Sequence, residues 1–143
     1  MDLSELMTDQ TMEKEGVWFT HGDARFRIAS ENSPAYQRAI QRHTQTAGPM
    51  LVRSKPEEMT KVMIQSMADG ILLEWEGLTA GGEVVACHVG KGATKEQKEL
   101  TRANKVKILS VPAMRNWISV CMQDLTRFQA EADADVEKTL GEP

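Results

Sequence analysis

The stretch "ILLEWEGLTAGGEVV", residues 71–85, decides the fold of the central part of the chain. In it an apolar run meets two glutamates, Glu74 and Glu76, and a second apolar run follows Gly81-Gly82. On a helix the two carboxylates would lie about 200° apart around the axis and could not act on one substrate atom. On a strand they would share one face and could form a catalytic pair. The residues before this stretch favour the helix.

The sequence from Pro56 to Trp75 has the three- and four-residue period of an amphipathic helix. A proline followed by acidic residues suits a helix start, because acids favour the positive end of the helix dipole. The apolar positions that form one face are Met59, Met63, Ile64, Met67, Ala68, Ile71, Leu72 and Trp75. We therefore predict a helix over residues 57–76 that ends at Gly77, with a kink or a close helix contact at Gly70.

The residues on the N-terminal side of this helix predict a β-hairpin and a polar helix. "VWFT" (17–20) and "ARFRIA" (24–29) are rich in β-branched and aromatic residues and flank a Gly-Asp pair, which is typical of a hairpin turn. A proline after capping residues then predicts a helix from residue 34 that ends by Gly48-Pro49.

The residues on the C-terminal side predict a short strand over 83–89 and two further helices. Thr94 and Gln97 have the spacing of a capping box, which starts the first of these helices, and a proline ends it near residue 110. The final helix, predicted over 112–130, has an apolar face. That face contains Met114, Trp117, Ile118, Cys121, Leu125 and Phe128.

These elements predict one small, mainly α domain (α+β at the margin) with an N-terminal β-hairpin and one additional short strand. The 143 residues suffice for a single core over 17–129, between a flexible acidic arm over 1–14 and an acidic tail over 130–143. A net charge of −4 argues against nucleic-acid binding. No apolar stretch approaches the ~20 residues that cross a membrane, and the N-terminus is unlike a signal peptide, so we expect a cytoplasmic protein.

The residue types that carry catalysis are scattered along the chain. His21, His43 and His88 lack the spacing of a zinc site, and no phosphate-loop or nucleophile motif occurs. Cys87 and His88 are adjacent, and neighbours on a strand point to opposite faces. We therefore expect no enzyme activity, no metal and no cofactor. A small enzyme that uses Cys87, His88 and Glu74 is a further hypothesis.

One candidate surface for protein binding is a basic stripe on the helix that follows Thr94. Its residues recur at steps of 3, 4 and 3 and are Lys95, Lys98, Arg102 and Lys105. The stripe is either a solvated face partly neutralised by Glu96 and Glu99, or a docking face for an acidic segment of another copy. A contact of the second kind is head-to-tail and would generate rings or spirals.

A second candidate surface is a methionine face formed by Met59, Met63 and Met67. Methionine is flexible and polarizable, so such a face suits interfaces that adapt to more than one packing. Large aromatic side chains are expected to anchor the core. These structural anchors are Trp75, Trp117 and Phe128.

Four segments of the chain together resemble a known family. They are "ARFRIA", the helix "SPAYQRAIQRH", "ILLEWEGL" before a glycine-rich turn, and the closing "PAMRNWISVCMQDLTRFQ". Over roughly residues 17–129 the chain thereby resembles the tail assembly chaperones of long-tailed (siphovirus-type) bacteriophages. The most specific parts are Glu74-Trp75-Glu76-Gly77 and the final segment with Arg115, Trp117, Ile118 and Phe128. A phrase like "FTPENA" often precedes the penultimate helix in this family, where this chain has the basic "VGKGATKEQK".

The resemblance implies a non-enzymatic, mainly helical helper in the host cytoplasm that is not expected in the mature virion. Such proteins self-associate and bind the tape measure protein, which they keep soluble until the tail tube polymerises around it. The implied partners are the tape measure protein, further copies of the chain in a ring or spiral, a longer frameshifted form, and the tail tube protein. No nucleic acid or membrane is implied. The alternative is a virion structural subunit, such as a tail-tube or head–tail connector component.

Overall fold

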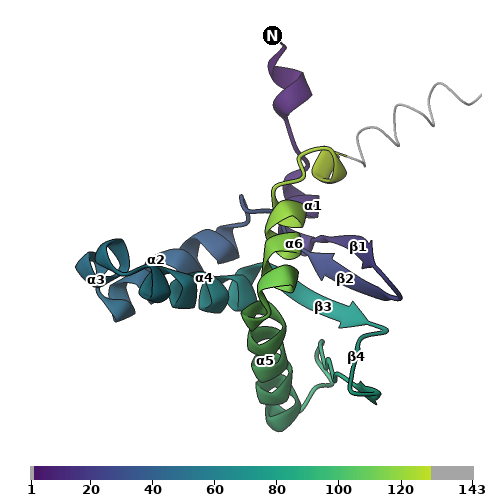
Figure 1. The fold of residues 1–143 in the computed structure, drawn as a ribbon. Coiled ribbons are helices and arrows are strands. Elements are labelled where there is room, and N and C mark those ends of the chain that lie inside the picture. The colour runs from purple at the N-terminus through teal and green to yellow at the C-terminus, as the bar shows by residue number, and fades with distance from the viewer. Residues whose placement is uncertain (1, 130–143) are drawn as a thin grey trace, which may run out of the picture.

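The computed structural model describes residues 2–129, which form α-helices around a small antiparallel sheet (Figure 1). The prediction of a mainly α fold with a few strands is confirmed, and the acidic tail predicted over 130–143 lies outside the described residues. With η for a 3-10 helix, the elements are η1 (Leu3–Leu6), α1 (Gln10–Glu15), β1 (Val17–His21), β2 (Ala24–Ile28), α2 (Pro34–Ala47), α3 (Pro49–Ser54), α4 (Pro56–Gly70), β3 (Leu72–Glu76), β4 (Thr79–Ala80), β5 (Glu83–Val84), α5 (Lys95–Ser110), α6 (Pro112–Met122) and η2 (Arg127–Gln129).

The predicted N-terminal hairpin is confirmed and supplies two of the three strands of the main sheet. β1 pairs with β2 in an antiparallel register, and Gly22 takes a φ of 61° in the turn between them. Phe26 and Ile28 are fully buried, whereas Arg25 and Arg27 project from the opposite face. This alternation gives the hairpin one face for the core and one for charged side chains.

The third strand, β3, occupies residues that the sequence predicted as the end of a helix. The helix prediction was wrong beyond Gly70, where α4 ends, because residues 72–76 pair antiparallel with β2. Gly77, expected as a helix cap, follows the strand instead and has a φ of 75°. The sheet order is therefore β1-β2-β3, with the hairpin at one edge and β3 at the other.

A β-bulge explains why this strand has the spacing of a helix. Ile28 of β2 faces Leu72, whereas the residue before Ile28 faces Glu74, so Leu73 is an extra residue in β3. The bulge places Leu72 and Trp75 on the same buried face although they are three residues apart. Three-residue spacing of apolar residues is also the period of a helix, which made the two structures indistinguishable by pattern.

The end of α4 lies directly against the start of α2. A Cβ atom at Gly70 would lie 2.5 Å from the Cα atom of Tyr36 and 2.6 Å from its backbone nitrogen. Only glycine permits two backbones to approach this closely. The close contact predicted at Gly70 is confirmed.

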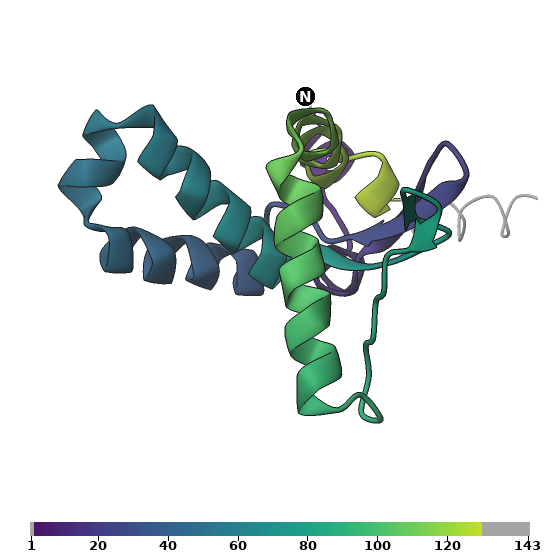
Figure 2. The same cartoon turned by 60° about the horizontal axis from the view of Figure 1, so that its bottom comes forward.

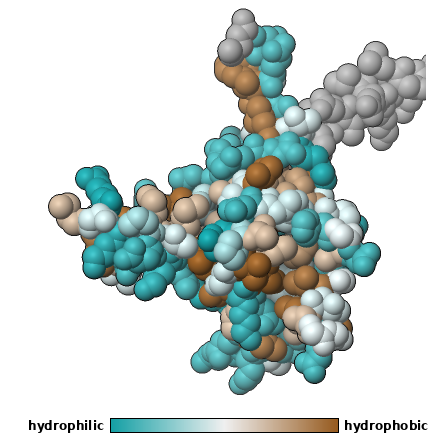
Figure 3. Space-filling view, in the orientation of Figure 1, coloured by the Kyte–Doolittle hydropathy of each residue, from teal (hydrophilic) through white to brown (hydrophobic). Residues whose placement is uncertain are grey.

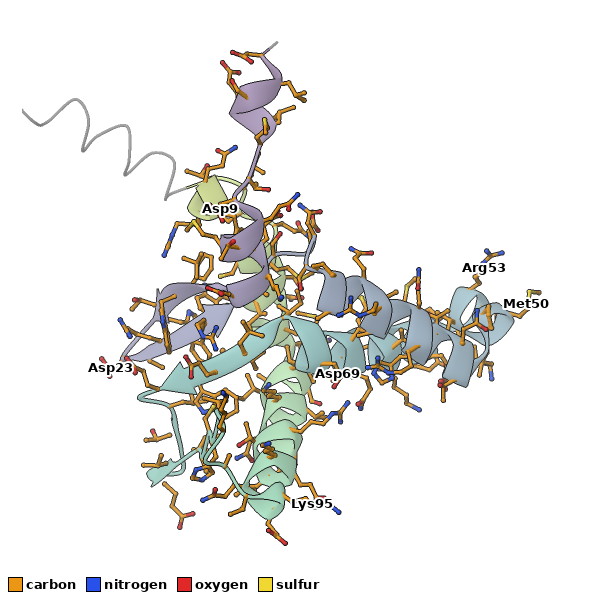
Figure 4. The ribbon with its side chains drawn as sticks, turned by 180° about the vertical axis from the view of Figure 1, so that it is seen from behind. Asp9, Asp23, Met50, Arg53, Asp69 and Lys95 are labelled. Atoms are coloured by element: carbon orange, nitrogen blue, oxygen red, sulfur yellow. The ribbon has the colours of Figure 1, made fainter. Side chains whose placement is uncertain are left out.

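Helices α2, α3 and α4 form an arm that projects from the rest of the described chain (Figures 1 and 2). α2 and α4 pack along each other, and α3 closes the far end, where Met50 and Arg53 lie (Figure 4). Each helix begins with a proline at its first position, as the sequence predicted for α2 and α4. These prolines divide the arm into three separate helices with tight connections.

The C-terminal helices begin as predicted, and the second ends early. Thr94 Oγ1 accepts a hydrogen bond from Gln97 N (3.1 Å), and Thr94 N donates to Gln97 Oε1 (2.9 Å), so the capping box is confirmed. α6 ends at Met122, which corrects the helix predicted over 112–130. Phe128, expected on that helix, is buried on η2 instead.

The strand predicted over 83–89 is confined to β5, which pairs only with the two-residue strand β4. The residues after β5 run along α5 (Figure 2). Asn104 Nδ2 donates to Ala86 O (2.9 Å), and Thr101 Oγ1 accepts from His88 N (2.8 Å). Side chains of α5 thus satisfy backbone groups that a longer strand would have paired.

The segment predicted as a flexible arm, residues 1–14, contains η1 and most of α1. Glu13 is buried, and its carboxylate accepts hydrogen bonds from Thr8 Oγ1 (2.6 Å), Ser30 Oγ (2.9 Å) and Asn32 Nδ2 (2.8 Å). Burial raises the pKa of Glu13, but the three donors outweigh it and leave the pKa below its ordinary value. α1 is thereby attached to the turn after β2, whereas η1 projects away from it (Figure 1).

Aromatic rings join the hairpin to the C-terminal segment. The ring centroid of Trp117 lies 6.5 Å from that of Phe19 and 5.4 Å from that of Phe26, both in edge-on geometry. Phe128 lies 6.3 Å from Phe19 by the same measure. These contacts place two of the predicted anchors, Trp117 and Phe128, against the buried face of the sheet.

The third predicted anchor, Trp75, is buried on β3 rather than on a helix. The sequence predicted Trp75 near the end of the helix over residues 57–76. Its cross-strand partner is instead Phe26, and its indole Nε1 donates a hydrogen bond to Val85 O (2.9 Å). Trp75 therefore connects the main sheet to the segment that follows β5.

Candidate interaction surfaces

The two glutamates of "LEWEG" form ion pairs with arginines of the neighbouring strand. Arg27 Nε lies 2.8 Å from Glu74 Oε1, and Arg25 Nε lies 2.6 Å from Glu76 Oε1. The carboxylates do share one face, as on any strand, but each is paired with a cation across the sheet. Such pairs stabilise strand pairing by about 0.2–1 kcal/mol each. A catalytic acid would instead need surroundings that keep one carboxyl protonated.

In the enzyme hypothesis the thiol of Cys87 is the candidate nucleophile. Burial raises the pKa of the Cys87 thiol, whereas a thiol nucleophile needs a lowered pKa. Cys87 and Cys121 are both free thiols. Within residues 2–129, no group of three or more His, Cys, Asp or Glu side chains is placed to hold a metal ion.

Three of the four residues of the predicted basic stripe line a common pocket. Lys98, Arg102 and Lys105 project from α5 toward the segment after β5, and the pocket between them has a volume of about 240 Å³. Its other lining residues are His88, Val89, Gly90 and Thr101. Lys95 is the first residue of α5 and does not line this pocket (Figure 4). The stripe is thus a small basic pocket with one outlying lysine.

The positive charge of this pocket is partly neutralised by Asp69 of the α2–α4 arm. Arg102 Nε donates to Asp69 Oδ1 (3.0 Å), and Arg102 Nη2 donates to Gln65 Oε1 (2.7 Å). Burial lowers the pKa of Lys105. The sequence suggested that Glu96 and Glu99 of the same helix neutralise the charge of the stripe. Within residues 2–129, Arg102 of the stripe instead forms its ion pair with Asp69 of α4.

Asp69 connects the arm to α5, and Figure 4 shows it where the arm meets the rest of the fold. Its carboxylate accepts hydrogen bonds from Arg42 Nη2 (2.9 Å) and His43 Nε2 (2.6 Å) of α2, in addition to Arg102 of α5. Burial raises the pKa of Asp69, but these donors and the Arg102 charge leave it below the ordinary value. Sequence reasoning missed this residue, because its partners lie 26 to 33 positions away.

Replacing Asp69 with asparagine is expected to lower the free energy of unfolding at pH 7 by about 1–3 kcal/mol, since three donors lose a charged acceptor. A lowered pKa in the fold stabilises the protein above the unfolded pKa of about 3.9, and this contribution is lost as pH falls through the folded pKa. The difference between wild type and Asp69→Asn should therefore shrink below about pH 4. Urea unfolding followed by circular dichroism from pH 3 to 7 measures it, with the exposed Asp23→Asn as control. A difference that stays constant with pH would contradict the ion-pair role.

The predicted methionine face is divided between the surface and the core. Met59 and Met63 of α4 are 51% and 37% exposed, whereas Met67 is fully buried and cannot belong to a surface. Met50, at the far end of the arm, is 78% exposed, and the neighbouring Leu51 is 37% exposed. The exposed methionine surface therefore consists of Met50, Met59 and Met63, and the sequence pattern missed its most exposed member.

A second apolar surface is a groove beside the β4–β5 hairpin. It has a volume of about 500 Å³ and lies between this hairpin and helices α5 and α6. Its lining residues are Leu78, Thr79, Ala80, Glu83, Val84, Val85, Ala86, Leu100, Asn104, Lys107, Ile108, Val111 and Met114. No local pattern could reveal this groove, because it is assembled from two separate segments, residues 78–86 and residues 100–114, that meet only in the folded chain.

The chain matches no protein-family model, no curated protein and no solved structure. Across residues 2–129, no helix combines the length and the apolar character that membrane crossing demands. The basic pocket, the exposed methionine surface and the apolar groove are the three surfaces on which a function can be argued.

Proposed function

We propose that the chain is a tail assembly chaperone of a long-tailed bacteriophage. In this proposal it self-associates, binds the tape measure protein and keeps it soluble in the host cytoplasm until the tail tube polymerises around it. It then leaves before the virion is complete. A longer frameshifted form of the chain and the tail tube protein are further partners in this scheme.

The exposed methionine surface of the arm is the observation that supports this proposal most. A tape measure protein is a long, mainly helical chain whose apolar surface aggregates if left bare. Met50, Met59 and Met63 offer flexible, polarizable side chains that can follow different helix surfaces without a fixed pocket. A chaperone that binds many sites along one client needs this tolerance more than it needs tight binding.

The position of the arm supports the same function. The arm projects from the fold (Figure 2), so a client helix can lie against its far end without disturbing the core. Each contact of this size is weak, but several copies that bind one long client gain avidity from their number. Weak individual contacts also allow the polymerising tube to displace the chaperone.

A triple variant, Met50→Ser/Met59→Ser/Met63→Ser, tests the proposal. The tape measure protein is co-expressed with wild type or with the variant, and its soluble fraction is measured. Wild type should keep it soluble, and the variant should leave most of it in the pellet. The variant itself should remain folded, because substitutions at exposed sites change stability by no more than about 0.5 kcal/mol each. Circular dichroism verifies this.

The control is Val120→Ser on α6, an exposed apolar residue away from the arm. It should solubilise the tape measure protein as wild type does. Equal solubilisation by the triple variant would contradict a role of the methionine surface. If wild type itself fails to solubilise the client, the chaperone proposal fails. Mass spectrometry of purified particles separates it from a virion subunit, since a chaperone should be absent or present in traces.

A further inference from the structure

The N-terminal segment, residues 2–7, carries apolar side chains that the described fold does not cover. Leu3, Leu6 and Met7 are 73%, 49% and 64% exposed. In Figure 1 this segment leaves the fold at its upper end, and Figure 3 colours one side of it brown, the colour of hydrophobic residues, and the other side teal. Exposed apolar residues that occur singly need no explanation, but three within five positions form a patch.

The direction of this segment is fixed at its base. Gln129 Nε2 donates hydrogen bonds to Glu5 O (2.8 Å) and Met7 O (2.7 Å), and Asp9 N donates to Phe128 O (3.1 Å). Leu3 and Leu6 lie three positions apart on η1, a spacing that brings side chains of a 3-10 helix onto one side. The segment therefore presents its apolar side chains outward, away from its own core.

The apolar groove between the β4–β5 hairpin and α5 is a surface of matching chemistry. Among its lining residues Val84, Leu100 and Val111 are exposed, so the groove offers apolar surface that residues 2–129 leave open. Its polar lining includes Lys107, which can pair with an acidic side chain such as Asp2 or Glu5.

The groove of the same copy is out of reach. Figure 1 places the N-terminal segment at one end of the fold and β4 with the start of α5 at the other. The sheet and helix α6 lie between these two ends. Six residues span at most about 20 Å when fully extended. Since the base of the segment is held by Gln129, the match between segment and groove can be made only between two copies.

We propose that Leu3, Leu6 and Met7 of one copy dock in the apolar groove of a second copy. Because the segment and the groove lie on different parts of the fold, each copy can give one contact and accept another. The interface is heterologous and repeats head to tail, which produces a ring if it closes and a spiral if it does not. This inference deepens the self-association part of the proposed function and requires nothing of the client.

Two complementary variants test this interface. The segment variant is Leu3→Ser/Leu6→Ser, and the groove variant is Val84→Glu/Leu100→Glu. Sedimentation velocity is recorded over a concentration series for each variant, for wild type and for an equimolar mixture of the two variants. Wild type should associate in a concentration-dependent way, and each variant alone should dissociate with a Kd raised roughly tenfold or more. The mixture should form a 1:1 complex and nothing larger, because one intact segment meets one intact groove.

The matched control is Val120→Ser/Leu125→Ser, which replaces two other exposed apolar residues and should associate as wild type does. Association of the segment variant at wild-type strength would overturn the proposal. So would a groove variant that still associates, since that outcome indicates pairing between segments. A mixture that stays monomeric would also overturn it. A monomeric wild type overturns this inference and the self-association part of the proposed function, whereas solubilisation of the tape measure protein tests client binding separately.

Discussion

Replacing Gly70 with alanine is expected to lower the free energy of unfolding by about 3 kcal/mol or more, although alanine is the better helix former. Helix propensity alone would make the substitution stabilising by roughly 1 kcal/mol. The added methyl group, however, would lie 2.5 Å from the Cα atom of Tyr36, and a backbone atom cannot rotate aside as a side chain can. The end of α4 and the start of α2 would have to separate, which opens the base of the arm.

Urea unfolding followed by circular dichroism measures this effect. The control is Gly92→Ala, because a Cβ atom at Gly92 meets no atom within 4 Å. Gly92→Ala should change stability by no more than about 0.5 kcal/mol. A lowered free energy of unfolding for Gly70→Ala would support the close contact with Tyr36, because helix propensity alone predicts a raised one. A variant as stable as wild type would mean that the two helices are not in contact at this point.

Replacing Trp75 with alanine is expected to cost about 3–5 kcal/mol, a large share of the 5–15 kcal/mol that stabilises a typical domain. The loss has two parts. The indole fills the buried face of the sheet beside Phe26, and its Nε1 donates to Val85 O. Without it the sheet has a cavity and the segment after β5 loses its connection to the core. Thermal and urea unfolding should both report the loss.

One further variant separates these contributions, and another serves as a control. Trp75→Phe keeps an aromatic ring but removes the donor, so it should cost less than Trp75→Ala. Glu76→Gln removes one exposed ion pair and should change stability by less than about 1 kcal/mol. A Trp75→Ala variant within 1 kcal/mol of wild type would show that this side chain does not anchor the fold.

The parts of the fold that local chemistry specifies could be predicted from the sequence. The Gly-Asp turn with alternating strands, the Thr94–Gln97 capping box and the prolines that begin α2, α4 and α6 each act within a few residues. Such signals do not depend on the rest of the chain. They were sufficient to establish a mainly α fold with an N-terminal hairpin.

The parts that depend on distant residues could not be predicted. β3 exists because β2 offers an edge with which it can pair, and its bulge at Leu73 gave Leu72 and Trp75 the spacing of a helix. The same limit applies to the surfaces. The charges of the basic stripe could be seen in the sequence, but its partner Asp69 and the apolar groove arise only when separate elements meet.

The hydrogen bond between Trp75 and Val85 has a spectroscopic consequence. Val85 belongs to the wall of the apolar groove, and its carbonyl oxygen accepts the indole proton of a residue in the core. A side chain that enters the groove and moves this wall changes the hydrogen bond of the indole, and with it the wavelength of its emission. Trp75, one of the three tryptophans of the chain, is thus an intrinsic fluorophore attached to the groove, and we expect its share of the emission to respond to occupancy without a label.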